Sequence, residues 1–325
     1  MRVKKEIAFL CCILTAAGVA VAILCVLRSG GGQQPKPSPP AERHDEAKSI
    51  RVVTSKRSAP SDMDGAVSWD VSAVVAVVCG KDRASADRYE IRNDALRSIA
   101  RRRDLAEGDV SALMAYVASE KGSLHPAREA ALRNDVLNLL RDQETIPPTL
   151  PGLLVDIVRR GRHDARLVDY AVQHLGALQH GLGDEETVRR VREVLFEAAS
   201  GIGKPFAGTA LYALADARGL TDAESRRLRR LTVAACSPRA NPLVRLSAFQ
   251  LAGQRGYREA LPHVRSVLRG GRRDAVMDTV AVGTLGLLGG ASDAALIKSF
   301  SARGGSRLAG PCAAAIERID ERKKE

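Results

Sequence analysis

One short phrase of apolar and small residues recurs seven times along this chain of 325 residues. Residues 244–253 read VRLSAFQLAG and residues 277–286 read MDTVAVGTLG. When the copies are aligned on a small central residue, they lie 32 to 41 residues apart. A repeat of this period predicts stacked helix pairs rather than a fold built around one central core. The seven aligned positions are Ala95, Val136, Ala171, Ala210, Ala248, Ala281 and Ala313.

The segments between the phrases have the pattern of a second, amphipathic helix. In residues 109–117 the apolar positions are 110, 113, 114 and 117, which share one helical face. Hydrophobic residues make up 45% of the chain but aromatic residues make up 3%, so burial depends on Ala, Leu, Val and Ile. A small residue at the phrase centre lets neighbouring helices approach closely. We therefore expect an all-α fold of roughly six to seven helix pairs, each phrase helix being followed by its partner.

The phrase resembles the HEAT-repeat family, in particular the short HEAT-like repeats also found in phycobilin lyases. The resemblance is clearest in residues 242–253, PLVRLSAFQLAG, followed by 260–268, ALPHVRSVL, and it extends over about 87–322. It implies an α-solenoid over 66–325 with a concave groove for binding partners. It carries no activity, and the aromatic and cysteine chemistry of the lyases has no counterpart here that would attach a pigment.

The N-terminus has the composition of a membrane anchor. Residues 7–27 contain no charged residue, and Arg2, Lys4, Lys5 and Arg28 flank them. Twenty-one residues at about 1.5 Å each match the roughly 30 Å hydrocarbon core of a bilayer. The run is longer than the apolar part of a typical signal peptide, which is about 7–15 residues. Residues 1–28 are therefore predicted to be an uncleaved anchor, with a cleaved signal as the alternative.

Residues 29–65 are rich in Gly and Pro and predict a tether between the anchor and the repeats. The short basic head favours an orientation with the head inside and the repeats outside. In a bacterium this orientation places residues 66–325 in the periplasm, on a single-pass protein of the inner membrane. A cleaved N-terminus would instead give a secreted protein.

The net charge of +12 has two readings. The arginines gather in clusters, which could present one edge of the array to carboxylate or phosphate groups. The alternative is that these arginines decorate solvated helix faces and helix C-termini. Nucleic-acid binding is disfavoured because stacking aromatic residues are scarce. The clusters lie at 101–103, 159–162, 189–192, 226–230 and 269–273.

No group of residues predicts catalysis, a metal or a cofactor. Residues 200–205, SGIGKP, lack the spacing of a phosphate-binding loop, and a helix–helix turn is expected there. His174 and His180 are six residues apart and point to different faces of one helix. The six cysteines, Cys11, Cys12, Cys25, Cys79, Cys236 and Cys312, lack metal-ligand spacing.

The function expected from these patterns is a membrane-anchored, non-enzymatic scaffold that binds a protein partner in the bacterial envelope. Residues 7–27 would contact the membrane, and neither nucleic acid nor a small molecule is expected as a ligand. Two alternatives remain open: an accessory subunit that docks onto an envelope enzyme and positions an anionic ligand, and a cytosolic nucleic-acid-binding protein with the reverse orientation.

Overall fold

The computed structural model describes residues 70–161, 163–270, 274–304 and 308–324, and all regular structure in these ranges is helical. They belong to one compact unit, Ala66–Glu325. The expected anchor at 7–27, the tether at 29–65 and Trp69 lie outside the described residues. Among the helices that are described, none is long and apolar enough to cross a membrane.

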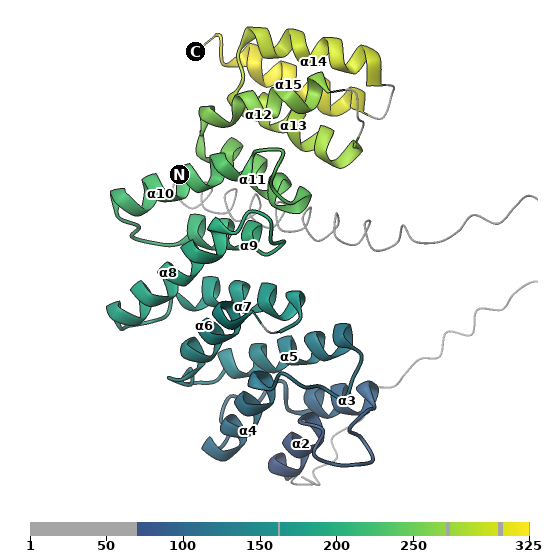
Figure 1. Ribbon diagram of the computed structural model, residues 1–325, viewed down its shortest axis with the longest axis vertical. Helices are drawn as coiled ribbons and strands as arrows, with labels where there is room; N and C mark the ends of the chain where they lie inside the picture. Colours follow the sequence, from purple (N-terminus) through teal and green to yellow (C-terminus); the bar gives the residue numbers. More distant parts are fainter. Residues whose placement is uncertain (1–69, 162, 271–273, 305–307, 325) are drawn as a thin grey trace, which may run out of the picture. The chain divides into compact units, whose positions relative to one another are not determined.

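The described helices stack in two layers, which Figure 1 shows from α2 in purple to α15 in yellow. The even layer contains α2 (Val71–Val78), α4 (Glu107–Ala118), α6 (Leu150–Arg160), α8 (Glu185–Ser200), α10 (Asp222–Ala235), α12 (Leu261–Arg269) and α14 (Ala291–Gly304). The odd layer contains α3 (Tyr89–Ile99), α5 (Pro126–Arg141), α7 (Ala165–Leu178), α9 (Ala207–Asp216), α11 (Pro242–Arg255), α13 (Ala275–Leu288) and α15 (Ala309–Glu321). A short 3₁₀ helix, η1 (Arg258–Ala260), leads into α12. This stack of helix pairs is the arrangement of an α-solenoid.

The pairing of the helices differs from the expectation in one respect. Each phrase lies on an odd helix, but that helix packs more extensively on the even helix before it than on the one after it. The pairs are therefore α2–α3, α4–α5 and so on to α14–α15, which gives seven within the described residues. Each odd helix from α5 to α13 also packs against the odd helix before it and the odd helix after it. The phrase on such a helix therefore contacts three neighbouring helices.

Close approach between odd helices explains the glycines in the later phrases. A Cβ atom on Gly176 of α7 would lie 2.7 Å from the Cβ of Ala213 on α9. A Cβ on Gly286 of α13 would lie 2.9 Å from the Cβ and 3.0 Å from the Cα of Ala315 on α15. From α7 onward the odd helices also contact one another more extensively than the even helices do. Glycine is required at these points because a side chain would push the backbones apart.

Five of the seven predicted phrase centres are fully buried: Val136, Ala171, Ala210, Ala248 and Ala281. Ala95 is half-buried, and the prediction for Ala313 is wrong because that residue is exposed. On α15 the buried face consists of Cys312, Ala315 and Ile319, so the last phrase was aligned one residue too late. Burial of Cys312 as a small apolar residue is confirmed.

Helix starts follow the capping signals in most places. Asp70, Asp184 and Thr221 cap α2, α8 and α10 through their side chains, as their sequences predict. Ser292 does not cap α14, because the helix begins at Ala291 and the serine lies in its first turn. The N–H of Gly290 donates instead to Oδ2 of Asp293 at 2.9 Å, so a carboxylate inside the first turn satisfies it.

Two glycines on α13 test the close approach directly. Replacing Gly286 by Ala should lower the free energy of unfolding by about 1 kcal/mol, because an overpacking cost of about 1–3 kcal/mol exceeds the gain in helix propensity. A Cβ atom on Gly283 would have nothing within 4 Å. Gly283→Ala should therefore stabilise by about 0.5–1 kcal/mol. Urea unfolding of both variants checks the opposite signs, and equal shifts would refute close packing at Gly286.

Candidate functional site

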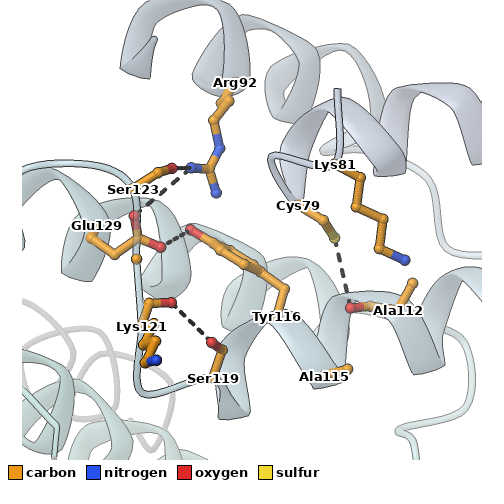
Figure 2. A pocket seen from close by; sticks show the side chains of 11 residues that line it. Cys79, Lys81, Arg92, Ala112, Ala115, Tyr116, Ser119, Lys121, Ser123 and Glu129 are labelled. Carbon is orange, nitrogen blue, oxygen red and sulfur yellow. Dashed lines mark hydrogen bonds and ion pairs between the residues drawn. The ribbon is translucent and has the colours of Figure 1, made fainter. Parts of the chain in front are cut away.

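A pocket with a volume of about 480 Å³ opens where the pairs α2–α3 and α4–α5 meet (Figure 2). It is framed by the turn after α2, by the exposed side of α4 and by the loop between α4 and α5. Figure 2 shows Lys121, Ser123 and Glu129 on one side of Tyr116, and the small residues Ala112 and Ala115 with Lys81 on the other. The lining residues are Cys79, Lys81, Arg92, Ala112, Ala115, Tyr116, Ser119, Lys121, Gly122, Ser123 and Glu129.

Glu129 on α5 organises the buried part of this site. Its Oε1 accepts hydrogen bonds from the Tyr116 hydroxyl at 2.7 Å and from Arg133 Nε at 3.1 Å. Its Oε2 accepts from the N–H of Leu124 at 3.3 Å and lies 3.8 Å from Arg92 Nη1. All three charged side chains are less than a tenth exposed. Because a buried charge without partners is costly, this network holds the two helix pairs together.

Arg92 on α3 approaches the site from the other side. Its Nε donates to the carbonyl of Val78 at 2.9 Å, and its Nη1 donates to the carbonyl of Ala86 at 3.1 Å and to Oγ of Ser123 at 3.2 Å. Its Nη2 is buried and has no hydrogen-bond partner among the described residues. Figure 2 shows the guanidinium directed down toward the ring of Tyr116, whose centroid is 5.0 Å from the Arg92 Cζ.

The second guanidinium near the Tyr116 ring belongs to Arg133, with its Cζ 5.2 Å from the ring centroid. Arg133 Nη2 donates to the carbonyl of Lys121 at 3.0 Å, and its Nη1 donates to the carbonyl of Ser119. Arg133 therefore fixes the loop that leads from α4 to α5. Each guanidinium near the ring stabilises the fold by about 0.5–2 kcal/mol, and the upper end of this range applies to a desolvated pair.

Two glycines let the loops come close to the charged groups. Gly80 has φ of 67°, and a Cβ there would lie 3.2 Å from the Arg92 guanidinium. At Gly122 a Cβ would lie 2.4 Å from Cδ of Glu129. A side chain at either position would crowd the buried Arg92 or Glu129, so glycine is required in both loops.

Burial sets the protonation of the two weak acids that line the pocket. Desolvation, followed by the charge of Glu129, raises the pKa of Tyr116, so its hydroxyl stays protonated and donates. Desolvation also raises the pKa of the Cys79 thiol, against the lowering effect of Lys81 and Arg92. The thiol donates to the carbonyl of Ala112 at 3.6 Å. With Lys81, Arg92 and Lys121 against Glu129, the lining carries an excess of positive charge suited to an anion.

Some arginines of the clusters identified in the sequence pair with carboxylates of the neighbouring repeat, and Arg102, Arg160 and Arg189 pair with carboxylates close to them in sequence. Arg159 Nη2 lies 2.8 Å from Glu197, Arg227 Nη1 lies 2.8 Å from Glu193, and Arg229 Nη2 lies 2.5 Å from Glu259. Arg192 donates to the carbonyls of Arg218 and Gly219, the latter at 3.2 Å. Residues 162 and 271–273 lie outside the described residues. These pairs connect α6, α8, α10 and η1, so they join repeats.

The histidines are also engaged in structural contacts. His174 is buried between α5 and α7, where Nε2 contacts Oδ1 of Asn134 at 3.2 Å and Nδ1 contacts Nη1 of Arg141 at 3.4 Å. His180 Nε2 lies 3.0 Å from Asp216, on α9. No group of three or more potential metal ligands gathers in the residues that the structure describes. Residues 201–206 connect α8 to α9 by turns, as expected for that segment.

The pocket was missed in the sequence, although a signal for it exists. The first two phrases share the letters RND: Arg92 to Asp94 in one and Arg133 to Asp135 in the other. An arginine at the same place in two apolar phrases indicates a buried cation that needs partners. Spacing alone could not show that both arginines converge on Tyr116 and Glu129, which lie on different helices.

Replacing Glu129 by Ala should lower the free energy of unfolding by roughly 3–5 kcal/mol, because it leaves Arg133 and Arg92 without their shared carboxylate. Tyr116→Phe removes one hydrogen bond to a charged group and should cost about 1.5 kcal/mol. Glu90→Ala is the matched control, since Glu90 on α3 pairs with Arg128 on α5 at 3.2 Å and joins the same two helix pairs on the exposed surface. Urea unfolding measures all three, and an equal effect of Glu90→Ala and Glu129→Ala would contradict the network.

His174 should make stability depend on pH. Desolvation, followed by the charge of Arg141, lowers its pKa to about 4, so the folded chain favours the neutral ring. Relative to an unfolded pKa of about 6.5, this contribution is complete above that pH and is lost as the pH falls to about 4. Its size is roughly 3 kcal/mol. His174→Gln should reduce the loss of stability between pH 7 and pH 4 by that amount, as urea unfolding at the two pH values would measure, and an unchanged loss would contradict this role of His174.

No family model and no curated protein matches this chain. Among solved structures, it is similar to that of human deoxyhypusine hydroxylase in complex with glycerol. The match covers 77% of this chain and 96% of that chain, with 15% sequence identity and a TM-score of 0.31.

Proposed function

We propose that the chain is a HEAT-like scaffold without catalytic activity, held at a membrane by residues 7–27, which binds a protein partner through its odd-numbered helices. The observation that carries the proposal is a difference in chemistry between the two layers. The even layer exposes charged side chains that pair with one another, whereas the middle of the odd layer exposes few charges.

Several arginines of the even layer are paired with carboxylates of a neighbouring helix. Ion pairs run from α6 to α8, from α8 to α10 and from α10 to η1, and Arg265 of α12 binds Asp293 of α14 at 2.7 Å. An anionic ligand would have to displace these carboxylates before it could bind the arginines that they pair with. The alternative function, in which an arginine-lined edge presents an anionic ligand, therefore has less support than protein binding.

The odd-layer surface from α7 to α13 is rich in amides, hydroxyls and apolar side chains. Tyr212 donates to Oε1 of Gln250 at 3.1 Å, and Thr209 donates to Oδ1 of Asp169 at 2.6 Å, so hydrogen bonds cross between neighbouring helices. Leu287, 42% exposed, is one of the large apolar residues that reach solvent. We use the name odd-layer stripe for eight partly or fully exposed residues on α7, α9, α11 and α13. They are Gln173, Thr209, Tyr212, Leu246, Gln250, Gln254, Val280 and Leu287.

This composition is that of a protein interface. The centres of such interfaces are depleted of charge and enriched in aromatic residues, with polar groups that can form hydrogen bonds. The two carboxylates beside the stripe are already engaged, Asp169 by Thr209 and Gln173, and Asp216 by His180. The partner surface expected is therefore uncharged and rich in hydrogen-bonding side chains.

A crosslinking capture from membranes tests the proposal with two opposed variants. Gln254→Arg combined with Leu287→Asp places charge on the odd-layer stripe and should reduce capture of the partner by tenfold or more, since an unpaired charge at an interface is strongly disfavoured. Ala234→Arg places a charge at an exposed position of α10 in the even layer and should leave capture of the partner unchanged. Loss of capture with Ala234→Arg alone would contradict the proposal.

A reporter fusion tests the predicted orientation. Alkaline phosphatase fused after residue 325 should be active in intact bacteria, because that enzyme folds in the oxidising periplasm. The same fusion to a chain without residues 7–27 is the control and should be inactive. An inactive fusion to the full chain would contradict the periplasmic placement and would favour the reverse orientation.

A further inference from the structure

We infer that the pocket between α2–α3 and α4–α5 binds a small phosphate monoester, an anionic ligand that the scaffold function does not require. The inference rests on a buried guanidinium with an unused donor, on the charge of the lining and on the small apolar wall opposite it. It is independent of the odd-layer stripe, which lies on later repeats.

The unused donor is the terminal nitrogen Nη2 of Arg92, a side chain that is 1% exposed. Nε and Nη1 are held by two carbonyls and the Ser123 hydroxyl, so the guanidinium cannot rotate to satisfy Nη2 elsewhere. Buried donors normally have an acceptor, because an unsatisfied one costs free energy. Because Nη2 is closed to solvent as well, an anion in the pocket would become this acceptor by displacing a group that covers Nη2 beside the Tyr116 ring.

The charge of the lining favours a dianion. Lys81, Arg92 and Lys121 line the pocket with one carboxylate, Glu129. Three positive charges against one negative charge leave an excess of two. The Glu129 oxygens already accept from Tyr116, Arg133 and the N–H of Leu124, so that carboxylate is not free to cover the lysines. A phosphate monoester carries about −1.5 to −2 charges at pH 7 and balances this excess better than a carboxylate does.

The shape of the pocket limits the rest of the ligand. Cys79, Ala112 and Ala115 form a wall of small side chains, and Figure 2 shows them, with Lys81 beside them, on the far side of Tyr116 from Glu129. A volume of about 480 Å³ lies within the range of small-ligand sites, which is about 300–1,000 Å³. The expected ligand therefore joins one phosphate group to a short apolar body.

Calorimetric titration of the full chain in detergent tests this assignment with three probes. Butyl phosphate should bind saturably at one site, and butyrate should bind at least tenfold more weakly. Dihexanoyl phosphatidate carries the same phosphate group on a lipid. Tighter binding of this lipid than of butyl phosphate would identify a membrane source of the ligand, and weaker binding would identify a soluble one.

Variants and a chemical probe place the binding in the pocket. Lys81→Gln combined with Lys121→Gln should weaken butyl phosphate binding by about tenfold without loss of fold, because both lysines are exposed. Lys298→Gln, at an exposed position of α14, should bind as the parent does. Bound butyl phosphate should slow alkylation of Cys79, followed by mass spectrometry of its peptide, and should leave the buried Cys236 as slow as before.

Three results would overturn the assignment: no saturable binding of butyl phosphate or dihexanoyl phosphatidate, equal binding of butyrate and butyl phosphate, or no protection of Cys79 at saturating ligand. An equal loss of binding in Lys298→Gln would also overturn it, since binding would then follow the net charge of the chain and not the pocket.

Discussion

Close contact between the backbones of successive odd helices is the constraint on which the rest of this structure depends. At Gly176, Gly208 and Gly286 the next odd helix approaches so closely that a side chain would collide with it, and at Gly253 a side chain would be in tight contact with Leu287. This packing explains why the chain has few aromatic residues and many alanines. It also explains why the even helices, which contact one another less, carry the long arginine side chains and their carboxylate partners. Neighbouring repeats are therefore joined in two ways. In the odd layer the contacts are van der Waals contacts between buried apolar groups, and in the even layer they include ion pairs.

The N-terminal end is built differently. The position five residues after the phrase centre is Gly176, Gly253 and Gly286 in three of the later phrases, but it is Arg141 in the second. An arginine there cannot permit close backbone contact with the next odd helix, and α5 contacts α7 less extensively than the later odd helices contact one another. The contact between α3 and α5 is less extensive still. The network of Arg92, Tyr116, Glu129 and Arg133 takes its place, and the pocket opens beside it. The site thus follows from a local departure from the repeat.

The sequence predicted the architecture because periodicity reports which residues share a face. Val136, Ala171 and Ala281 were placed in the core on spacing alone, and all are buried. Spacing did not show which neighbouring helix each phrase prefers, because both flanking helices are amphipathic. It also misplaced Ala313, because the small residues on both sides of it leave the alignment of that phrase ambiguous by one position. The pocket escaped prediction because its side chains come from α3, α4 and α5 and from two loops, and their convergence depends on the fold.

Hydrogen exchange of the full chain, resolved by helix, measures the central claim most directly. If close contact in the odd layer holds the repeats together, then within each pair from α6–α7 to α12–α13 the odd helix should exchange its amide hydrogens more slowly than the even helix. The opposite order, or equal exchange in the two layers, would contradict the account, because the charged even layer would then contribute as much to the stability of the stack as the closely packed odd one.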